Sequence, residues 1–348
     1  MRAVVLEKFG GPEELAFRDA AEPELSPESV LVRVRAVGVC GRDLIDARGG
    51  FPALSLPAIL GHEFAGEVLA VGERVQSLSV GDRVVNLHRP YCGECNRCQA
   101  GESVDCERAW QSFGHTIPGG YAERVAAHYR ALVKFPPAID FAEAAPLMCT
   151  AGVALHALRH RARVTLGEQV LITGASGGVG VCAVQIAKAL GTRVIATTGN
   201  QSKLERLKQL GADEVIVTGA GGFHDQVRAL SDGGVDVALE LTGNPTFASA
   251  LRSLRAGGRM VVVGNIDTRK VELNLGAMIV FSTALLGSHG ATHRDVADCF
   301  QLMQDGKLRM IIERRLPLEH AAEAHRLLFA RQVFGRVVLI ANQVSGRG

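Results

Sequence analysis

Residues 169–190 read QVLITGASGGVGVCAVQIAKAL, and they carry the strongest fold signal in the sequence. Its first five residues have the composition of a buried strand, a glycine-rich turn occupies 174–180, and the apolar positions that follow have helical spacing. A glycine turn between a strand and a helix lets the backbone approach a pyrophosphate at the helix N-terminus, where free amides and the helix dipole favour anions. The stretch therefore predicts a dinucleotide-binding unit.

The same alternation of strand and helix continues along the chain. The strand candidates, separated mostly by amphipathic segments, are residues 169–173, 193–197, 214–217, 236–240, 259–264 and 283–287. Strands alternating with helices indicate a parallel sheet that is covered on both faces and joined by right-handed crossovers. We therefore expect an α/β fold in which a doubly wound Rossmann sheet spans residues 151–290.

The glycine motif is matched imperfectly. Ala175 replaces its first glycine, whereas Gly177 and Gly180 keep the close backbone approach and the helix contact. Such a turn can also be an ordinary loop, but its place between strand and helix favours a cofactor, and it lacks the ending of a nucleotide-triphosphate loop. The predicted cofactor-binding residues are Ala175, Ser176, Gly177, Gly178, Val179, Gly180, Thr198, Asn200, Ser202, Lys203, Thr242 and Gly264.

The cofactor predicted from the second strand is NADP(H) rather than NAD(H). An NAD enzyme normally has Asp or Glu at the end of this strand to bond the ribose hydroxyls. Residues 197–203 read TTGNQSK, which contains no acid to repel a 2′-phosphate and offers donors and one positive charge to bind it. The alternative is that these residues, Ser202 especially, only cap the next helix.

The first part of the chain has a different pattern. Alternating stretches such as 30–35 and 67–71, broken by Gly and Pro, indicate half-buried strands. Beyond residue 290 the pattern is helical, until a last strand at 335–340 that we expect to return to the first domain. We predict a β-rich catalytic domain from residues 1–150 and 291–348, with the cofactor domain inserted at 151–290.

Composition excludes several classes of protein. The chain has 348 residues, enough for two cores, with 40 glycines and only 5% aromatic residues, which suits an α/β protein. The net charge is +2 and the basic residues form no tract, so no nucleic-acid partner is expected. We see no export signal and no apolar run of the length that spans a membrane, and we expect a cytoplasmic protein.

Four of the eight cysteines stand together, at Cys92, Cys95, Cys98 and Cys106. Four thiolates at this spacing can close a tetrahedral shell around zinc without an open position, which predicts a structural site. The alternatives are cysteines packed as small hydrophobes, or a zinc ribbon for nucleic acid, which the acidic residues around the cluster disfavour. Cys182 and Cys299, on predicted helices, are expected to be buried hydrophobes.

Three further segments carry possible ligands, namely Cys40-Gly41-Arg42-Asp43, Gly61-His62-Glu63 and Pro146-Leu147-Met148-Cys149. One His and two Cys would supply the three protein ligands of a catalytic zinc and leave one position for water or substrate. A lone Cys or His is more often a core residue, so spacing alone does not decide between these readings.

These segments resemble the zinc-containing medium-chain dehydrogenases and reductases, which include the alcohol dehydrogenases, and the resemblance covers essentially the whole chain. It implies a GroES-like catalytic domain beside the Rossmann domain and two zinc ions per subunit. By this resemblance Cys40, His62 and Cys149 bind the catalytic zinc, and Asp43 orients His62. Glu63 is expected to lie behind the metal or to serve as an occasional ligand, and the four-cysteine cluster binds the structural zinc.

The sequence departs from alcohol dehydrogenases at Arg42, where the family usually has a Ser or Thr that relays the substrate proton. Arg stays charged and cannot be that relay, and the later relay histidine is also missing. The segments 40–44, 264–267 and 287–292 resemble the acryloyl-CoA reductase branch. Two reactions therefore stay open, reduction of an aldehyde or ketone to an alcohol and reduction of an activated C=C bond. A non-catalytic homologue is a third, remote alternative.

Further expectations concern the substrate pocket and assembly. The substrate is a small carbonyl, alcohol or enoyl compound. Arg42 either contacts its carboxylate, phosphate or thioester group or forms a salt bridge to Asp or Glu at the domain interface. Ile45, Trp110 and Met148 are candidate pocket residues. The resemblance implies a homodimer or homotetramer assembled through the last strand of the cofactor sheet, at 283–287, whose edge would otherwise be exposed.

Overall fold

The computed structural model describes residues 1–50, 52–109, 111–219 and 222–341, and it divides into two compact units. Unit 1 comprises Met1–Cys149, Ala291–Phe300 and Ile312–Gly348, and unit 2 comprises Thr150–Gly290 and Gln301–Ile311. Trp110 lies outside the described residues.

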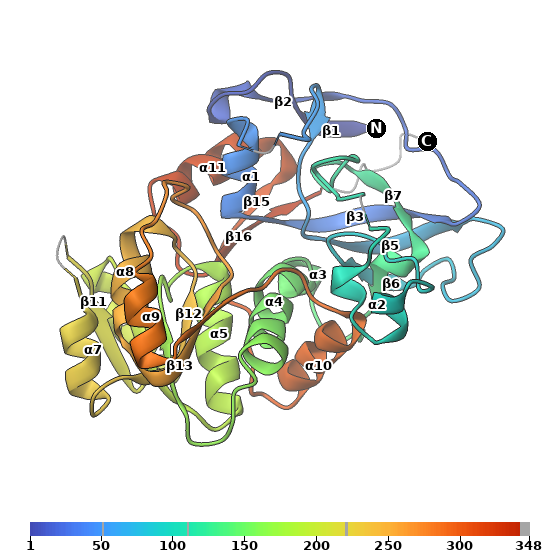
Figure 1. Cartoon of the computed structure of the whole chain (residues 1–348). Helices are drawn as coiled ribbons and strands as arrows, with labels where there is room; N and C mark the ends of the chain where they lie inside the picture. Colours follow the sequence, from blue (N-terminus) through green and yellow to red (C-terminus); the bar gives the residue numbers. More distant parts are fainter. Residues whose placement is uncertain (51, 110, 220–221, 342–348) are drawn as a thin grey trace. The chain divides into compact units, whose positions relative to one another are not determined.

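Unit 1 is built on two sheets (Figure 1). The smaller has the order β2-β1-β4, with β1 at Arg2–Leu6, β2 at Leu15–Asp19 and β4 at Ala58–Ile59. The larger has seven strands, which are β3 (Ser29–Val39), β5 (Phe64–Val71), β6 (Arg83–Asn86), β7 (Arg124–His128), β8 (Leu132–Lys134), β15 (Ile312–Pro317) and β16 (Arg336–Ile340). Their order is β15-β16-β3-β5-β6-β8, and β7 also pairs with β3.

Strand β3 is the centre of the larger sheet. Val30, Val32 and Val34 point into the core, as the alternation in the sequence predicts, because successive side chains of a strand face opposite sides. β16 pairs antiparallel with β3, which confirms that the last strand returns to the first domain. This unit also contains the helices α1 (Gly41–Ala47), α2 (Asn96–Gln99), α3 (Phe141–Ala144), most of α10 (His293–Gln304) and α11 (Ala321–Phe329).

Unit 2 is a parallel six-stranded sheet with the order β11-β10-β9-β12-β13-β14. The strands are β9 (Gln169–Ile172), β10 (Arg193–Thr198), β11 (Glu214–Val217), β12 (Val235–Glu240), β13 (Leu254–Val262) and β14 (Ala284–Gly287). The helices are α4 (Val153–His156), α5 (Gly178–Ala189), α6 (Leu204–Gln209), α7 (His224–Leu230), α8 (Asn244–Arg252) and α9 (Leu275–Phe281). The α/β fold class, with a Rossmann-like parallel sheet, is confirmed.

Two boundaries differ from the sequence prediction. β13 begins at Leu254 instead of residue 259, because the segment before Arg259 also pairs with β12, through a register shift. Residues 301–311, predicted to belong to the β-rich domain, pack in unit 2. They do so because the side-chain amide of Gln185 on α5 bonds both the N–H and the C=O of Arg309, at 3.0 and 3.1 Å.

Two expectations about apolar residues have different outcomes. Cys182 and Cys299 are fully buried, as predicted. The helical stretch Phe141–Arg161, in contrast, is long and apolar enough to span a membrane by length and composition, which the sequence reading missed. Since 83% of its apolar window is buried inside the structure, it has the property of a core helix, and the test is weak support for a membrane span.

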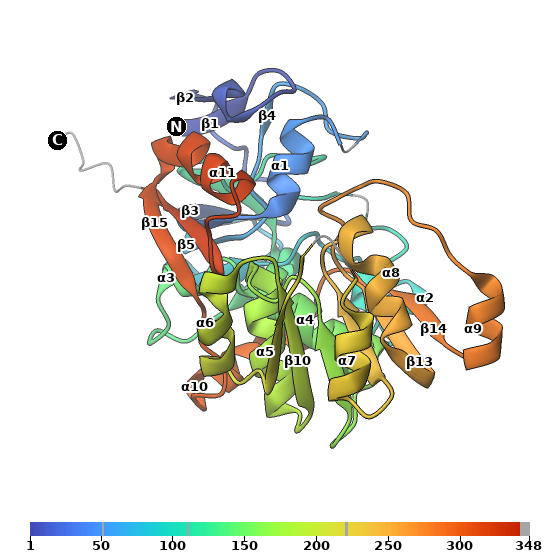
Figure 2. The same ribbon diagram turned by 90° about the vertical axis from the view of Figure 1, so that its left-hand side faces the viewer.

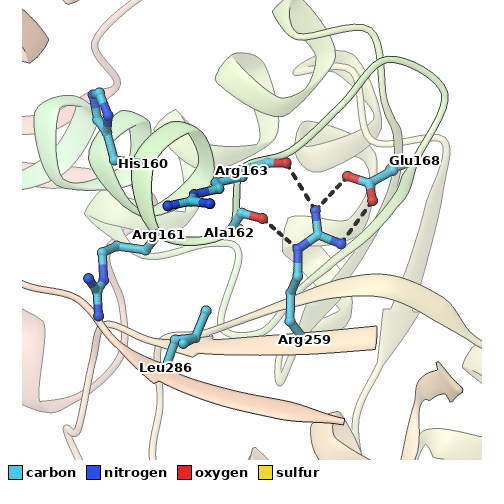
Figure 3. A pocket seen from close by; sticks show the side chains of 7 residues that line it. All are labelled: His160, Arg161, Ala162, Arg163, Glu168, Arg259 and Leu286. Carbon is cyan, nitrogen blue, oxygen red and sulfur yellow. Dashed lines mark hydrogen bonds and ion pairs between the residues drawn. The ribbon is translucent and has the colours of Figure 1, made fainter. Parts of the chain in front are cut away.

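The end of this helical stretch is tied to the sheet of unit 2 by Arg259 (Figure 3). Its guanidinium donates to the carbonyls of Ala162 and Arg163 and to both carboxylate oxygens of Glu168. The last carbonyls of a helix lack partners within the helix, so Arg259 caps this end. A hollow of about 470 Å³ lies beside it, and the cationic side chains that line it complement the negative end of the helix dipole.

Candidate metal centre

Unit 1 brings together the side chains that the sequence predicted as catalytic ligands. Cys40 follows β3, His62 precedes β5, and Cys149 lies in the π-helical turn Met148–Gly152. Ligand atoms of Cys40, His62, Glu63 and Cys149 all lie within 4.8 Å of one another. The Cys149 Sγ to His62 Nε2 distance is 3.6 Å, which matches the edge of about 3.6 Å expected between a sulfur and a nitrogen on tetrahedral zinc. The donor set therefore fits zinc.

Asp43 stands behind His62, as the resemblance implied. Its Oδ1 is 3.1 Å from His62 Nδ1, although the N–H direction falls short of a well-aligned hydrogen bond. Burial opposes ionisation of Asp43, but the neighbouring His62 outweighs this effect and lowers the pKa of the carboxyl below its usual value. The carboxylate therefore stays charged and can hold the proton of His62 on Nδ1, which leaves Nε2 for a metal.

Glu63 has a partner that the sequence reading missed. Arg336, on β16, donates to both carboxylate oxygens of Glu63, at 2.5 and 3.1 Å. Its Nη2 also lies 3.5 Å from Cys40 Sγ. A hydrogen bond with Cys149 and the charge of Arg336 lower the pKa of Cys40 against the effect of burial, which favours the thiolate that binds metal. No local pattern marks Arg336, since only the pairing of β16 with β3 brings it here.

Gly38 makes room for this ion pair. A Cβ at position 38 would lie against Glu63 Oε2, and only glycine lets the carboxylate occupy that space. Burial raises the pKa of Glu63 to about 7, although Arg336 acts in the opposite direction.

Arg42 forms a salt bridge within its own helix, whereas the sequence predicted a partner at the domain interface. Its Nε donates to Asp46 Oδ1 at 2.8 Å, one helical turn further along α1. Asp46 is fully buried and also faces His115 Nε2 at 2.6 Å. The carboxylate is therefore shared between a guanidinium and an imidazole.

Two histidine rings that the sequence reading missed lie beside His62. The ring centroids of His88 and His115 are 5.1 and 5.7 Å from that of His62. Burial lowers the pKa of His88, which favours a neutral imidazole. Of the proposed pocket residues, Met148 is fully buried and Ile45 is half-buried.

The four-cysteine cluster is compact and fits a tetrahedral metal site. The Sγ–Sγ distances are 3.9 Å for Cys92–Cys98, 4.0 Å for Cys95–Cys106 and 3.6 Å for Cys92–Cys106. A tetrahedron with zinc–sulfur bonds of about 2.3 Å has edges of about 3.8 Å. Hydrogen bonds from the backbone N–H groups of Glu94 and Cys95 lower the pKa of Cys92 to about 6, which favours the thiolate.

The predicted cofactor residues lie in unit 2, around the carboxyl ends of β9, β10, β12 and β13. Gly174 has a positive φ of 55°, and Gly178 begins α5. A Cβ at Gly180 would approach the Ala175 backbone to 2.5 Å, so this glycine allows the close helix contact expected of the motif. The Thr242 hydroxyl lies in the space that a side chain at Gly174 would take, and Gly264 packs against the backbone of Leu241.

The residues after β10 show how the chain turns there. Asn200, rather than Ser202, caps the short 3₁₀ helix Gln201–Lys203, because its Oδ1 accepts the N–H of Ser202. Thr198 donates from its hydroxyl to Ser176 in the glycine turn, at 3.3 Å. Asn200 and Ser202 are exposed, whereas Lys203 is only 8% exposed.

Comparison with known proteins places the chain in a family. The alcohol dehydrogenase GroES-like domain matches residues 26–137, and the zinc-binding dehydrogenase domain matches residues 178–305. An acryloyl-coenzyme A reductase from Sulfurisphaera tokodaii is 33% identical over 341 residues, 97% of this chain and 99% of that protein.

Two solved structures are also similar. The crystal structure of AibC has a TM-score of 0.92 and 43% identity and covers 99% of this chain and 96% of its own. A cobalt- and zinc-bound thermostable alcohol dehydrogenase from Pyrobaculum aerophilum has a TM-score of 0.87 and 32% identity, over 98% of this chain and 99% of its own. The chain belongs to the medium-chain dehydrogenase/reductase superfamily of oxidoreductases, in which it resembles both acryloyl-CoA reductases and alcohol dehydrogenases.

Replacing Arg336 with Met should lower the free energy of unfolding of unit 1. The change leaves Glu63 buried without its partner, and breaking a buried ion pair in this way costs about 3–5 kcal/mol. Urea unfolding of wild type and variant measures the loss. The double variant Arg336→Met/Glu63→Gln carries no unpaired charge and should recover part of it. Equal stability of the single variant and wild type would show that the pair contributes nothing.

Proposed function

We propose that the protein is a zinc-dependent oxidoreductase that transfers hydride between NADP(H) and a carbonyl or alcohol substrate. The observation that carries the proposal is the convergence of Cys40, His62 and Cys149, with Glu63 held by Arg336. Three ligands leave one position of a tetrahedral zinc for water or a substrate oxygen. Since two hydrogen bonds from Arg336 engage the Glu63 carboxylate, that carboxylate does not need to take the fourth position.

Each part of the site has a role in this proposal. Zinc in such a site acts as a Lewis acid on a carbonyl oxygen. Asp43 keeps the proton of His62 on the nitrogen that faces away from the metal, and Arg336 stabilises the Cys40 thiolate. The four-cysteine cluster would hold a second, structural zinc. The amides at the start of α5 would bind the cofactor pyrophosphate.

NADP(H) is the proposed cofactor because no acidic side chain follows β10. Asn200 and Ser202 are exposed there and offer donors for a 2′-phosphate, whereas Thr198 is 1% exposed and its hydroxyl donates to Ser176. Lys203 is too well buried to present its charge at the surface, so the preference would depend mainly on the missing acid and on these neutral donors.

The second candidate reaction is reduction of an activated C=C bond, such as that of acryloyl-CoA or another enoyl or enone compound. Arg42 in place of a relay hydroxyl favours it, and the similarity to an acryloyl-coenzyme A reductase points in the same direction. Zinc could stabilise the enolate oxygen of such a substrate as it does an alkoxide.

We also propose that the protein is a cytoplasmic homo-oligomer, a dimer or a tetramer, assembled through the edge of the cofactor sheet. β14 pairs only with β13 among the described residues (Figure 2). Helix α9, near this edge, exposes four large apolar side chains, Leu275, Ile279, Val280 and Phe281. An unpaired edge and an apolar patch are features that a second copy of the chain would cover.

The reaction is tested by NADPH oxidation with the zinc-loaded protein, offered simple aldehydes, acryloyl-CoA and free enones in parallel. We expect turnover of at least one class, and loss of it in the Cys149→Ala variant, which lacks one zinc ligand. Aldehyde turnover alone would exclude the enoyl reductase, and product analysis showing a saturated C=C bond would replace the alcohol dehydrogenase assignment. Turnover that survives in Cys149→Ala would contradict the role of zinc.

Cofactor preference is tested at Gly199, where a side chain meets no other atom within 4 Å and φ is not positive. Gly199→Asp places a carboxylate at the end of β10, where it repels a 2′-phosphate and accepts ribose hydroxyls. We expect the ratio of kcat/KM for NADPH to that for NADH to fall by about tenfold or more. Gly199→Asn has the same size without the charge and should keep the wild-type preference. An unchanged ratio in Gly199→Asp would contradict the proposal.

Assembly is tested by sedimentation velocity. The wild type should sediment as a dimer or tetramer, and Ile279→Asp should shift it toward the monomer, because a charge in an apolar interface is not solvated. Leu166→Asp, which changes an apolar residue that is 85% exposed elsewhere on unit 2, is the matched control and should leave the mass unchanged. A monomeric wild type would overturn the proposal.

A further inference from the structure

Three buried side chains from distant segments, His325, Tyr121 and Asp43, form a hydrogen-bonded chain, and the last of them faces the predicted metal ligand His62. His325, on α11, has its Nε2 3.1 Å from the Tyr121 hydroxyl. That hydroxyl donates to Asp43 Oδ2 at 3.2 Å, and Asp43 Oδ1 faces His62 Nδ1 at 3.1 Å. Tyr121 is fully buried, and His325 is 1% exposed.

The hydrogens of this chain can point in only one direction. Burial, together with Asp43, raises the pKa of Tyr121, so its hydroxyl keeps the single hydrogen that it has. The Asp43 carboxylate only accepts, so this hydrogen points to Asp43. The hydroxyl oxygen can then only accept from His325 Nε2–H. Every donor in the chain therefore points toward Asp43.

Asp43 transmits this arrangement to His62. Its Oδ2 accepts from both Tyr121 and the backbone N–H of Cys40, the latter at 2.8 Å. Two donors on one oxygen fix the rotation of the carboxylate and therefore the direction in which Oδ1 faces. Since His62 Nδ1 is buried and Asp43 Oδ1 is the acceptor close to it, that direction decides how well the imidazole is held.

Packing fixes Tyr121 itself next to the same segment. Gly61, immediately before His62, has a positive φ of 92°, and a Cβ there would overlap the Tyr121 ring. The backbone N–H of Tyr121 also donates to the Leu60 carbonyl at 3.0 Å. The ring therefore lies against the backbone that carries the ligand, and a change in the hydroxyl need not move the ring.

We propose that Tyr121 and His325 are positioning residues for the metal: through Asp43 they set the tautomer and orientation of His62, and so the affinity of the site for zinc. The inference rests on the proposed function, because it requires zinc at Cys40, His62 and Cys149. It ties α11, which supplies no ligand, to the properties of the metal centre.

The test measures the rate at which zinc is released to a chromophoric chelator. The release phase that is present in the wild type and missing in Cys149→Ala is assigned to the catalytic site. Tyr121→Phe removes only the hydroxyl, and Tyr129→Phe is the matched control at another tyrosine of unit 1. His325→Leu removes the donor to Tyr121, whereas His325→Gln keeps an N–H at that position. The Co(II)-substituted proteins report the ligand field of the same site in their difference spectra against Cys149→Ala.

Removing an outer partner of a ligating histidine typically costs 10–100-fold in metal affinity. We expect Tyr121→Phe and His325→Leu to release the catalytic zinc on the order of 10-fold faster and to shift the Co(II) bands, while Tyr129→Phe and His325→Gln behave as wild type. Wild-type rates and spectra in Tyr121→Phe and His325→Leu would overturn the inference and leave the proposed function intact. If the wild type and Cys149→Ala show the same release phases, the wild type holds no zinc at Cys149. That result would overturn both the inference and the proposed function.

Discussion

The ion pair between Glu63 and Arg336 is the interaction on which the arrangement of unit 1 depends. It joins the segment of His62 to β16, and it places a guanidinium beside the Cys40 thiolate. A buried ion pair adds little net stability, because desolvation offsets most of the attraction, but an unpaired buried charge is costly. The pair therefore acts mainly as a constraint, since β16 must lie where its arginine meets the carboxylate.

Around the candidate metal centre, the buried carboxylates Asp43 and Asp46 are also each held by a partner from another segment. Asp43 is clamped by Cys40 N–H and Tyr121, and Asp46 is shared by Arg42 and His115. Because Asp43 faces the predicted ligand His62, holding Asp43 in place would reduce the ordering that metal binding requires. Unit 2 is organised differently, because its predicted cofactor residues lie in glycine turns and loops around the carboxyl ends of parallel strands.

Local patterns in the sequence predicted much of this arrangement. The strands of unit 2 and the glycine turn follow from periodicity and from residues that are neighbours in the chain, and so does the grouping of the four cysteines. Cys40, His62 and Cys149 are far apart, and only the resemblance to a family joined them. Their convergence depends on the pairing of β3 with β5 and on the turn that holds Cys149, neither of which has a local signal.

Most of the contacts that sequence reasoning missed are long-range. Arg336, Tyr121 and His325 look like ordinary members of a strand, a loop and an amphipathic helix, and nothing in their neighbourhoods distinguishes them. Residues 301–311 were assigned to the wrong domain for the same reason, since a long-range contact holds them in unit 2. That contact is the pair of hydrogen bonds made by the side-chain amide of Gln185 on α5. The helix cap is Asn200 and not the predicted Ser202, because the position of a cap depends on backbone angles that composition does not specify.

We propose that this chain holds one zinc in a closed shell of four sulfurs and a second in an open shell of two sulfurs and one nitrogen. Zinc K-edge X-ray absorption of the purified protein, together with its metal content, tests this most directly. We expect two zinc ions per chain and an average of about three sulfur neighbours per zinc at about 2.3 Å, with nitrogen or oxygen at about 2.0–2.1 Å. One zinc per chain with four sulfur neighbours would contradict it, because the catalytic position would then bind no metal.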